Sequence, residues 1–431
     1  MTAQAGHAMN PALTARALRE SCLQAGADDV GFVSIADPAL GEEGQEILSR
    51  FPFAKTLISL VFRLNRENVR TPLRSIANLE FHQTTEYANE VARDIVKHLE
   101  SLGHKAVNPA AGFPMEMAAW PGRMWAVSHK TVAVAAGTGR MGINRLVLHP
   151  VHGAFITLGT VVTDALIERS GKALETNPCL DCKLCVAACP TGAISPDGAF
   201  DFNACYTHNY REFMGGFLDW TETVASSGSA RKLRAKISDA ESVSMWQSLA
   251  FGPNYKAAYC MSVCPAGDDV IGAYRANRAG FMNEVVKPLT EKVETLYVIK
   301  GSDAERHAAK RFPHKRRKIV PNTLRPASIK GFLSGLPWAF QRGASKGLEA
   351  VFHFDFRGEE REQATVTIKD GRLKVEPGHV GKPDLTLRAD ARTWIRFLAK
   401  EVWLPWAVLR GGIRIKGDPR LLLAFGRCFP T

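Results

Sequence analysis

Four cysteines in one short stretch have the spacing of an iron–sulfur cluster motif. They follow one another in steps of three, three and four residues, and a proline comes directly after the last: Cys179, Cys182, Cys185, Cys189 and Pro190. Thiolates at this spacing wrap a four-iron cluster in bacterial two-cluster proteins. Zinc is the alternative, because cysteines separated by two residues also suit a tetrahedral zinc site. The proline and the Thr-Gly-Ala-Ile sequence after it favour the cluster, so we expect a protein that transfers electrons.

A second motif, Cys260-x3-Cys264-Pro265, predicts a second cluster. In the two-cluster arrangement the cysteine before each proline ligates the other cluster. Cluster one is therefore expected to bind Cys264 and the first three cysteines of the first motif. Cluster two is expected to bind Cys189, Cys260 and a lone cysteine between the motifs, Cys205.

The composition is that of a globular protein from a reducing compartment. The chain has 431 residues, of which 45% are hydrophobic, enough for two or three domains with cores of their own. Of its nine cysteines, only Cys22 and Cys428 lie far from the two motifs. Both stand in apolar surroundings, so we expect buried thiols rather than a disulfide. Oxygen-sensitive clusters without a disulfide framework indicate a reducing compartment.

The sequence contains no evident membrane-directing segment. Met1–Asn10 lacks the basic and apolar regions of a signal peptide, and the longest apolar run, 154–167, is interrupted by threonines and an aspartate. We therefore expect a cytoplasmic protein without a transmembrane segment. Part of the net charge of +12 lies in a basic run, Arg306–Lys318. Such a run is a solvated linker face, or a contact for nucleic acid, an acidic redox partner or anionic lipid.

Changes in the hydrophobic pattern divide the chain into four segments. Residues 1–168 mix helical and strand signals, including a helix over Ala15–Ala25 that stops at Gly26, which predicts an α/β or α+β domain. Residues 169–298 carry the cysteine motifs with weak periodicity, as expected where metal ligation supplies folding energy. Residues 299–326 are expected to be a basic linker. Two buried strands and an amphipathic helix complete the elements expected in the first segment: Val30–Val33, Thr56–Val61 and Tyr87–Leu102.

The last segment, 327–431, has the pattern of a small sheet. Apolar and polar residues alternate over Ala350–Phe356 and Ala364–Ile368, and the second run turns at Asp370-Gly371, a strong hairpin signal. Helical patterns follow, the first of them capped by Asp390. We expect an antiparallel sheet with helices over one face.

A glycine-rich stretch lies between the first segment and the cysteines. Gly137-Thr-Gly-Arg-Met-Gly142 matches the dinucleotide-binding pattern GxGxxG. That interpretation needs a helix after the third glycine, whereas Ile143–Leu148 reads as a strand. We therefore favour a helix that ends in a glycine cap and a turn into a strand.

The sequence from Ala136 to Asp164 resembles the region ahead of the clusters in epoxyqueuosine reductases, and reductive dehalogenases show a similar stretch. The resemblance continues through both cysteine motifs and covers about residues 12–290. It implies an α+β fold, with a nitroreductase-like domain that holds a cobalamin and a ferredoxin-like domain whose two clusters supply electrons. The implied cobalamin-facing residues include glycines that would let the backbone approach a flat macrocycle. They are Gly137, Gly139, Gly142, Asn144, Pro150 and Gly153.

The chain departs from that family at the second cluster. Three residues before Cys260, where the family usually has a further cysteine, the chain has Ala257. Cluster two is then a three-iron cluster, a four-iron cluster with an open iron, or one capped by another group such as His208.

A second departure falls at the expected proton donor. An aspartate of the family aligns with Thr131, which puts queuosine chemistry on tRNA in doubt. His129, which titrates near neutral pH, is a candidate general acid, although a histidine on a helix face is more often structural. Lys130 and Tyr87 are further candidates.

The last segment resembles the sterol carrier protein 2 fold over residues 345–425. The resemblance rests on Gly347, Phe352–Phe356, Asp370-Gly371 and Ile415–Asp418. That fold encloses an apolar tunnel. Six apolar residues either line such a tunnel or fill the core: Trp394, Phe397, Trp403, Leu404, Trp406 and Leu409.

Three functions agree with these features. The first is a reductase whose two clusters deliver single electrons to a cobalamin, which reduces a small or lipophilic substrate. The second is an iron–sulfur electron-transfer protein without cobalamin chemistry, and the third is epoxyqueuosine reduction on tRNA. The expected partners are a reduced ferredoxin or flavodoxin-type donor and a hydrophobic small molecule in the last domain, and nucleic acid is not expected.

Overall fold

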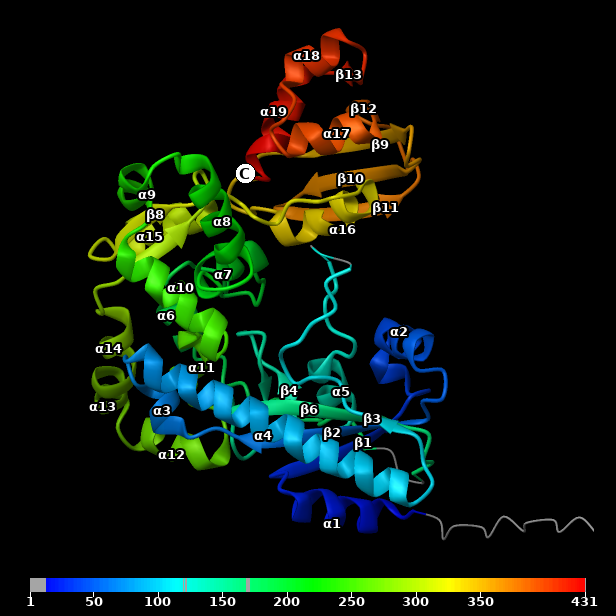
Figure 1. Ribbon diagram of the computed structural model, residues 1–431, viewed down its shortest axis with the longest axis vertical. Coiled ribbons are helices and arrows are strands. Elements are labelled where there is room, and N and C mark those ends of the chain that lie inside the picture. Colours follow the sequence, from blue (N-terminus) through cyan, green and yellow to red (C-terminus); the bar gives the residue numbers. More distant parts are fainter. Residues whose placement is uncertain (1–12, 119, 121, 168–170, 431) are drawn as a thin grey trace, which may run out of the picture. The chain divides into compact units, whose positions relative to one another are not determined.

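A computed structural model describes residues 13–118, 120, 122–167 and 171–430 (Figure 1). The chain forms two compact units, each assembled from separated segments. The first unit comprises residues 1–116, 125–185 and 259–286, and the second comprises residues 117–124, 186–258 and 287–431. The segment 169–298, expected to be one domain, is therefore divided between the units. Met1–Asn10, in which no signal peptide was expected, lies outside the described residues.

The first unit is built on a four-stranded antiparallel sheet with the strand order β1-β2-β6-β3. Strand β2 has seven consecutive buried residues, because helices cover both faces of the sheet. Ile58 and Leu60 on one face pack with α1 (Ala15–Ala25) and α4 (Arg74–Ser101). Leu57 on the other face packs with α2 (Glu42–Arg50) and α5 (His129–Ala135). The strands are β1 (Asp29–Ser34), β2 (Thr56–Arg63), β3 (Ala106–Val107) and β6 (Ile156–Thr163).

Local signals define where these elements begin and end. The Thr14 side chain accepts a hydrogen bond from the backbone of Ala17, and the chain leaves α1 at Gly26, where φ is 118°. This confirms the expected helix and its glycine stop. Helix α4 begins at Arg74, well before the expected Tyr87, so the amphipathic pattern marked only its second half.

The glycine-rich stretch forms a helix cap and a short hairpin, as favoured from the sequence. Helix α5 ends before Gly137, where φ is 79°, and the chain turns into β4 (Arg140–Met141). This strand pairs with β5 (Val147–Leu148), so no helix follows Gly142.

Short helices complete the first unit. Among them, α3 and α11 pack against each other, since the Ser262 hydroxyl donates a hydrogen bond of 2.8 Å to the Val69 carbonyl. Helix α6 spans the boundary between the two units. These elements are η1 (Pro38–Leu40), α3 (Arg66–Arg70), α6 (Leu184–Ala188), α11 (Tyr259–Ser262), α12 (Asp268–Ala276), α13 (Arg278–Phe281) and η2 (Met282–Val286).

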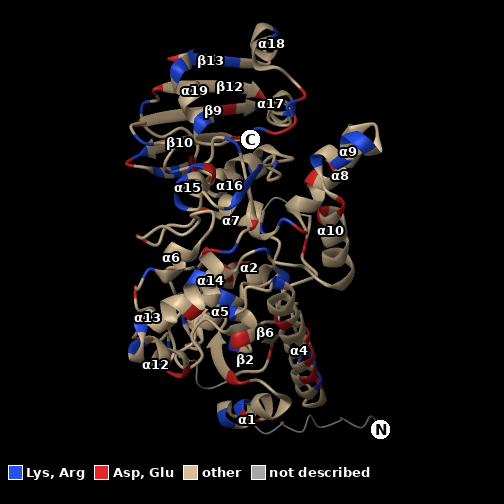
Figure 2. Cartoon of the chain, turned by 90° about the vertical axis from the view of Figure 1, so that its left-hand side faces the viewer, with Lys and Arg blue, Asp and Glu red and all other residues tan. Residues whose placement is uncertain are grey.

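The second unit begins with helices and a two-stranded parallel sheet. The sheet is formed by β7 and β8. Helix α9 is rich in lysine and arginine, so positive charge is spread along it (Figure 2). The elements are α7 (Phe202–Asn209), α8 (Gly215–Ser227), α9 (Ala230–Lys236), α10 (Asp239–Phe251), α14 (Lys287–Thr290), β7 (Thr295–Val298), α15 (Asp303–Arg311) and β8 (Arg316–Ile319).

The prediction that residues 299–326 form a linker is wrong, because the segment contains α15 and β8. Two of its cations, Lys315 and Lys318, are paired with acids, whereas Lys310, Arg311, Arg316 and Arg317 are exposed. Lys315 is 3% exposed, and its Nζ lies 2.7 Å from Glu294 Oε1. Lys318 Nζ lies 2.6 Å from Glu241 Oε2. Long basic side chains bury their stems while their charges find partners, so a basic run can fold.

The C-terminal part of the second unit is a five-stranded sheet with the order β11-β10-β9-β12-β13. Its β9–β12 pair is parallel, so the expectation of a purely antiparallel sheet is corrected. The predicted hairpin is confirmed at Asp370 and Gly371, which both have positive φ. The elements are α16 (Ile329–Ala339), β9 (Ala350–Arg357), β10 (Gln363–Lys369), β11 (Arg372–Pro377), β12 (Leu385–Asp390), α17 (Ala391–Leu398), α18 (Leu404–Leu409), β13 (Ile413–Gly417) and α19 (Pro419–Arg427).

One apolar core joins this sheet to its helices. Alternate residues of β9, Phe352, Phe354 and Phe356, are buried against residues of all four helices, which confirms the expected one-faced cover. Cys428 belongs to this core and Cys22 to the core of the first unit. Burial raises the pKa of Cys22 to about 12 and that of Cys428 to about 11, as expected for inert core thiols. Among the described residues no helix is both long and apolar enough to cross a bilayer.

Candidate metal centre

The four cysteines predicted for cluster one surround one cavity in the first unit. Cys179 and Cys182 lie in the loop that leads into α6, Cys185 lies in the first turn of α6, and Cys264 follows α11. Segments that are far apart in the sequence therefore bring four thiols together, namely Cys179, Cys182, Cys185 and Cys264.

The loop that carries Cys179 and Cys182 is held in an unusual conformation. Asp181 and Lys183, on either side of Cys182, have φ values of 52° and 61°, in the left-handed region that few side chains adopt. The Asn177 side chain accepts a 3.0 Å hydrogen bond from the Cys179 backbone and donates one of 3.1 Å to the Met141 carbonyl. Backbone strain of this kind persists where surrounding contacts enforce it, and here it wraps the loop around the cavity.

Burial and mutual repulsion oppose ionisation of these thiols. Burial, together with the neighbouring Cys182, Cys185 and Cys179, raises the pKa of Cys264 to about 12. Burial also raises the pKa of Cys182, and Cys179 adds to the effect. Four thiolates can share this cavity only with positive charge among them, and the iron of a cluster supplies it. The donor set therefore fits an iron–sulfur cluster.

The arrangement differs from that of a single-ion site. Within the part of the chain that the structure describes, no three His, Cys, Asp or Glu side chains are placed to hold one metal ion. Zinc draws its sulfurs to about 2.3 Å from a single point. A cluster is larger than one ion, so its thiolates surround a space, as the four cysteines do here.

The sequence did not predict the remaining walls of the cavity as part of a cluster site. Ile143 and Leu148, from the β4–β5 hairpin and its turn, line it together with Leu180 and Ala266. Asn144 also lines it, and its side chain donates a 3.4 Å hydrogen bond to the Cys260 carbonyl. Asn144 had been selected from the sequence as a cobalamin residue, so the resemblance marked the right segment but a different neighbour.

The glycines predicted to face a cobalamin are packed against the protein itself. A Cβ at Gly137 would lie 2.2 Å from the Lys172 carbonyl oxygen, and one at Gly139 would lie 2.5 Å from Val147. Gly142 is similarly close to Leu148, at 2.8 Å. The space beside these glycines is therefore filled by the chain, and they do not form an open cradle for a macrocycle. We derive no step through a cobalamin at this segment.

The segment Pro150–Gly153 instead braces the loop after Cys264. A Cβ at Gly153 would lie 1.8 Å from the Ala266 carbonyl oxygen, so only glycine allows this approach. The Pro150 and Val151 carbonyls accept hydrogen bonds of 2.9 and 3.1 Å from the backbone of Asp268 and Asp269. These contacts fix the loop between α11 and α12, which carries Cys264.

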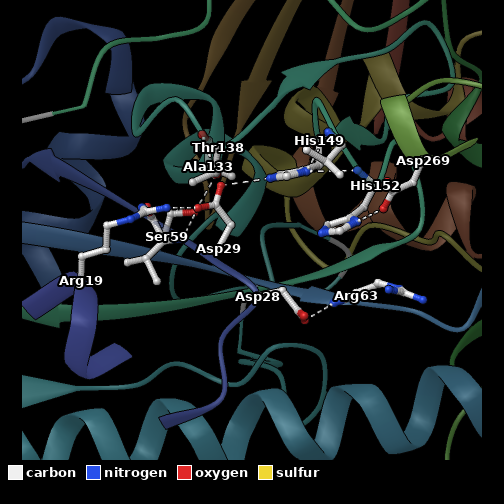
Figure 3. A network of polar contacts seen from close by, with 12 residues as sticks. Arg19, Asp28, Asp29, Ser59, Arg63, Ala133, Thr138, His149, His152 and Asp269 are labelled. Atoms are coloured by element: carbon white, nitrogen blue, oxygen red, sulfur yellow. Dashed lines mark hydrogen bonds and ion pairs between the residues drawn. The ribbon is translucent and has the colours of Figure 1, made fainter. Parts of the chain in front are cut away.

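A buried polar network anchors this brace to the sheet (Figure 3). His149 Nε2 lies 3.0 Å from Asp29 Oδ2, and His149 Nδ1 accepts hydrogen bonds from the backbone of Val151 and His152. Burial raises the pKa of Asp29, but hydrogen bonds from His149 and Arg19 outweigh it and lower the pKa to about 2. Asp29 is thus a carboxylate that orients His149, and His149 orients the turn.

Two of the cysteines predicted for cluster two lie in the second unit. Cys189 and Cys205 belong to one apolar cluster that also includes Leu296 and Val298. The Ala193 backbone donates a 3.3 Å hydrogen bond to Cys189 Sγ, a contact that stabilises a thiolate. Cys260 lies on α11, in the first unit. Ligation of a second cluster by these three cysteines stays a prediction.

The position that lacks the family's cysteine has a defined environment. The backbone of Ala257 donates a 2.9 Å hydrogen bond to Asn209, one turn beyond Cys205 on α7. His208, the alternative ligand considered above, instead accepts a 3.4 Å hydrogen bond from the Tyr297 backbone. Its Nε2 is buried without a hydrogen-bond partner among the described residues. Electrostatic interactions reach it from Glu294 and from three lysines, Lys256, Lys292 and Lys315.

The three candidate catalytic residues are directed to different partners. His129 Nδ1 lies 2.8 Å from Thr160 Oγ1, and its Nε2 lies 2.9 Å from the Ala110 carbonyl. Burial lowers its pKa, so both geometry and charge are those of a neutral structural histidine. Lys130 Nζ donates to the Arg145 carbonyl at 2.9 Å, and Tyr87 donates to the Gly26 carbonyl at 3.3 Å. Nothing in these contacts supports a role as proton donor.

The aromatic residues expected to line a tunnel divide into buried and exposed groups. Trp394 is 2% exposed and packs on Phe332 and Phe397. Trp403 is 75% exposed and Leu409 is 78% exposed, so neither lines a cavity. Trp406 is also exposed, while Phe397 and Leu404 are partly buried against the core. Three of the six residues expected to line a tunnel or fill the core, Trp403, Trp406 and Leu409, are therefore exposed.

Comparisons with known proteins agree with this architecture. Residues 339–430 match the SCP-2 sterol transfer family. A stretch of 82 residues is 33% identical to the epoxyqueuosine reductase of Listeria monocytogenes and covers 19% of this chain and 21% of that enzyme. The solved epoxyqueuosine reductase from Streptococcus thermophilus is 19% identical over 42% of this chain and 54% of that one, with a TM-score of 0.32. A catabolic reductive dehalogenase is 15% identical over 68% of this chain and 34% of that one, with a TM-score of 0.38.

The matches to the sterol transfer family and to the curated epoxyqueuosine reductases confirm these two resemblances drawn from the sequence. The chain spans about a fifth of the length of the curated relatives that it matches. Those relatives are reductases, and the C-terminal sheet and helices coincide with the matched sterol transfer segment.

Proposed function

We propose that this chain is an iron–sulfur oxidoreductase. The observation that carries the proposal is the single cavity lined by Cys179, Cys182, Cys185 and Cys264. The local match to epoxyqueuosine reductases supports reduction as the direction of the chemistry. The whole reaction would take single electrons from a reduced ferredoxin or flavodoxin-type donor and pass them to an acceptor.

The chain's own residues supply the setting for electron transfer. A bound cluster supplies reversible one-electron chemistry. The four cysteines would hold it, and the strained backbone at Asp181 and Lys183 would keep their thiolates in place. Leu148 and Ala266 in the cavity wall would keep water from the cluster, because both are buried. A dry setting and the thiolates' hydrogen bonds then determine how readily the cluster accepts an electron.

A second cluster would be held by Cys189, Cys205 and Cys260. Support for it comes from the motif spacing and from the Ala193 hydrogen bond to Cys189. With three thiolates, this cluster should lose an iron in air more readily than cluster one. The measurement is EPR of protein exposed to air for increasing times. Equal survival of both clusters would contradict the predicted difference.

Two more specific reactions are considered for this oxidoreductase: cobalamin-dependent reduction of a small or lipophilic substrate, and epoxyqueuosine reduction on tRNA. Epoxyqueuosine reduction is favoured by the local match, but Thr131 offers a hydroxyl that bonds to Ser128 at 2.9 Å, where the family places a carboxylate. A small or lipophilic substrate is favoured by the C-terminal match to a sterol transfer family. We therefore propose that the C-terminal domain binds a hydrophobic molecule rather than tRNA.

Anaerobic purification followed by optical and EPR spectra and by iron and cobalt analysis tests this proposal. We expect iron and acid-labile sulfide with the EPR signal of a reduced four-iron cluster. Cobalt retained through gel filtration, with turnover of epoxyqueuosine in tRNA, would replace the proposal by the tRNA enzyme. Protein that contains zinc and no iron after reconstitution would refute it.

A further inference from the structure

Arg70 is a buried cation at the end of α3. Its side chain is only 11% exposed. The guanidinium lies between two aromatic rings, 5.3 Å from the centroid of Phe155 and 5.3 Å from that of Phe281. The rings attract the cation but cannot replace the hydrogen bonds that it gave up on leaving water.

The partners of Arg70 do not compensate its burial. Among the described residues it forms an ion pair with Glu67 alone, at 3.5 Å, and the Glu67 side chain is 78% exposed. Nε and Nη2 are buried without a hydrogen-bond partner among the residues that the structure describes. Burial accordingly lowers the pKa of Arg70. An unpaired charge in such a place is costly unless a negative group nearby offsets it.

The negative group nearby is the predicted cluster site. Helix α3 is fastened to α11 by the hydrogen bond between Ser262 and the Val69 carbonyl, directly beside Arg70. Met261 packs against both the apolar cluster that contains Phe155 and the one that contains Cys264. Cys264 follows Ser262 by only two residues. Arg70 therefore lies on the side of the cavity where Cys264 would bind iron.

We propose that Arg70 is the buried counter-charge of the cluster held by Cys179, Cys182, Cys185 and Cys264, and that it raises the reduction potential of this cluster. The inference rests on the proposed iron–sulfur function. A cluster with four thiolates is an anion, and reduction adds one electron to it. A fixed positive charge in a low-dielectric setting stabilises the reduced form more than the oxidised form.

Redox titrations monitored by EPR test the inference on the full chain. In Arg70→Met, the cluster's reduction should become at least tenfold less favourable, which for a one-electron couple is a shift of about 59 mV to more negative potential. Arg70→Lys, which keeps the charge, should lie close to the wild type. Arg66→Met is the matched control, because this arginine is on the same helix but 39% exposed, where solvent screens its charge.

Each outcome is decisive for Arg70. An unchanged potential in Arg70→Met, with iron content retained, overturns the inference and leaves the proposed function standing. An equal shift in Arg66→Met also overturns it, because the effect would not depend on burial. If Arg70→Met retains no iron, Arg70→Gln is measured in its place. Loss of iron in both neutral variants but not in Arg70→Lys supports a requirement for charge, and loss in Arg70→Lys as well overturns it. Absence of iron from the wild type would instead refute the proposed function.

Discussion

At the scale of single residues, the features that matter most for the chemistry are ionisable side chains whose pKa values are shifted by burial. Cys264, Cys182 and Arg70 all have pKa values shifted toward the neutral form by burial. Each shift measures a free-energy cost that a bound cluster would relieve, since iron neutralises the thiolates and the anionic cluster pairs with the arginine. His129 and His208 are also buried but have no such partner, so they are expected to stay neutral.

His208 predicts a pH dependence of stability. Burial lowers its pKa from 6.5 to about 4, so the unfolded chain binds this proton at higher pH than the folded chain does. Its contribution to stability is present above pH 6.5 and is lost as the pH falls toward 4. Urea denaturation from pH 7 to pH 4 should show a shallower decline for His208→Gln than for the wild type. His98→Gln, at an exposed position, should leave the slope unchanged.

The sequence predicted residues well where their chemistry is written in a local spacing. The steps between Cys179, Cys182 and Cys185 grouped three cysteines that share a cavity with Cys264, and their role as ligands stays a prediction. Arg70 could not be predicted, because no motif contains it and only the packing of α3 on α11 brings it near Cys264. His129 was chosen for its side-chain type and its place beside Thr131, and its two hydrogen-bond partners come from distant segments.

At the scale of elements, the β4–β5 hairpin lines the cavity of the four cysteines, and the turn after it braces the loop that carries Cys264. The resemblance to cobalamin proteins selected this stretch, but its glycines permit close contact with the protein's own backbone. This difference could not be seen in the sequence, because a glycine that accommodates a cofactor and one that accommodates a neighbouring loop have the same local pattern.

Gly153→Ala tests that account of the turn. At this position φ is 59°, and a Cβ would meet the Ala266 carbonyl oxygen at 1.8 Å. The substitution should lower the free energy of unfolding by at least about 2 kcal/mol, measured by chemical denaturation. Gly272→Ala in α12 is the control, because nothing lies within 4 Å of its Cβ position and alanine favours helix. A neutral Gly153→Ala would show that the turn does not brace the Cys264 loop.

A second test at this scale compares how much Trp394 and Trp403 each contribute to stability. Trp394→Ala removes a side chain buried among Phe332, Phe354 and Phe397, and should cost about 3–5 kcal/mol. Trp403→Ala changes a side chain that is 75% exposed, so its effect should stay within about 0.5 kcal/mol. Thermal denaturation of both variants provides the comparison. Equal destabilisation would mean that α18 is buried in solution.

At the scale of the whole molecule, the sequence predicted the types of domain better than their limits. Mixed helix and sheet in the first segment and a sheet covered on one face at the C-terminus are both observed. The domain limits were misplaced because they were inferred from composition, which does not show how segments pack together. Basic residues at 306–318 indicated a linker, yet Lys315 and Lys318 are paired with Glu294 and Glu241 from other segments. Such pairs depend on tertiary contacts that a local charge pattern does not contain.

Iron content of Cys182→Ala is the measurement that tests the central claim most directly. Protein purified without oxygen should contain about eight iron atoms per chain with two four-iron clusters, or about seven if cluster two has three irons. Cys182→Ala should lose about four of them together with one EPR signal, because this thiol belongs to the four-cysteine cavity. Cys22→Ala, which alters a buried thiol outside both motifs, should keep them all. A Cys182→Ala protein that retains the wild-type iron content and spectrum would contradict the assignment of this cavity to an iron–sulfur cluster.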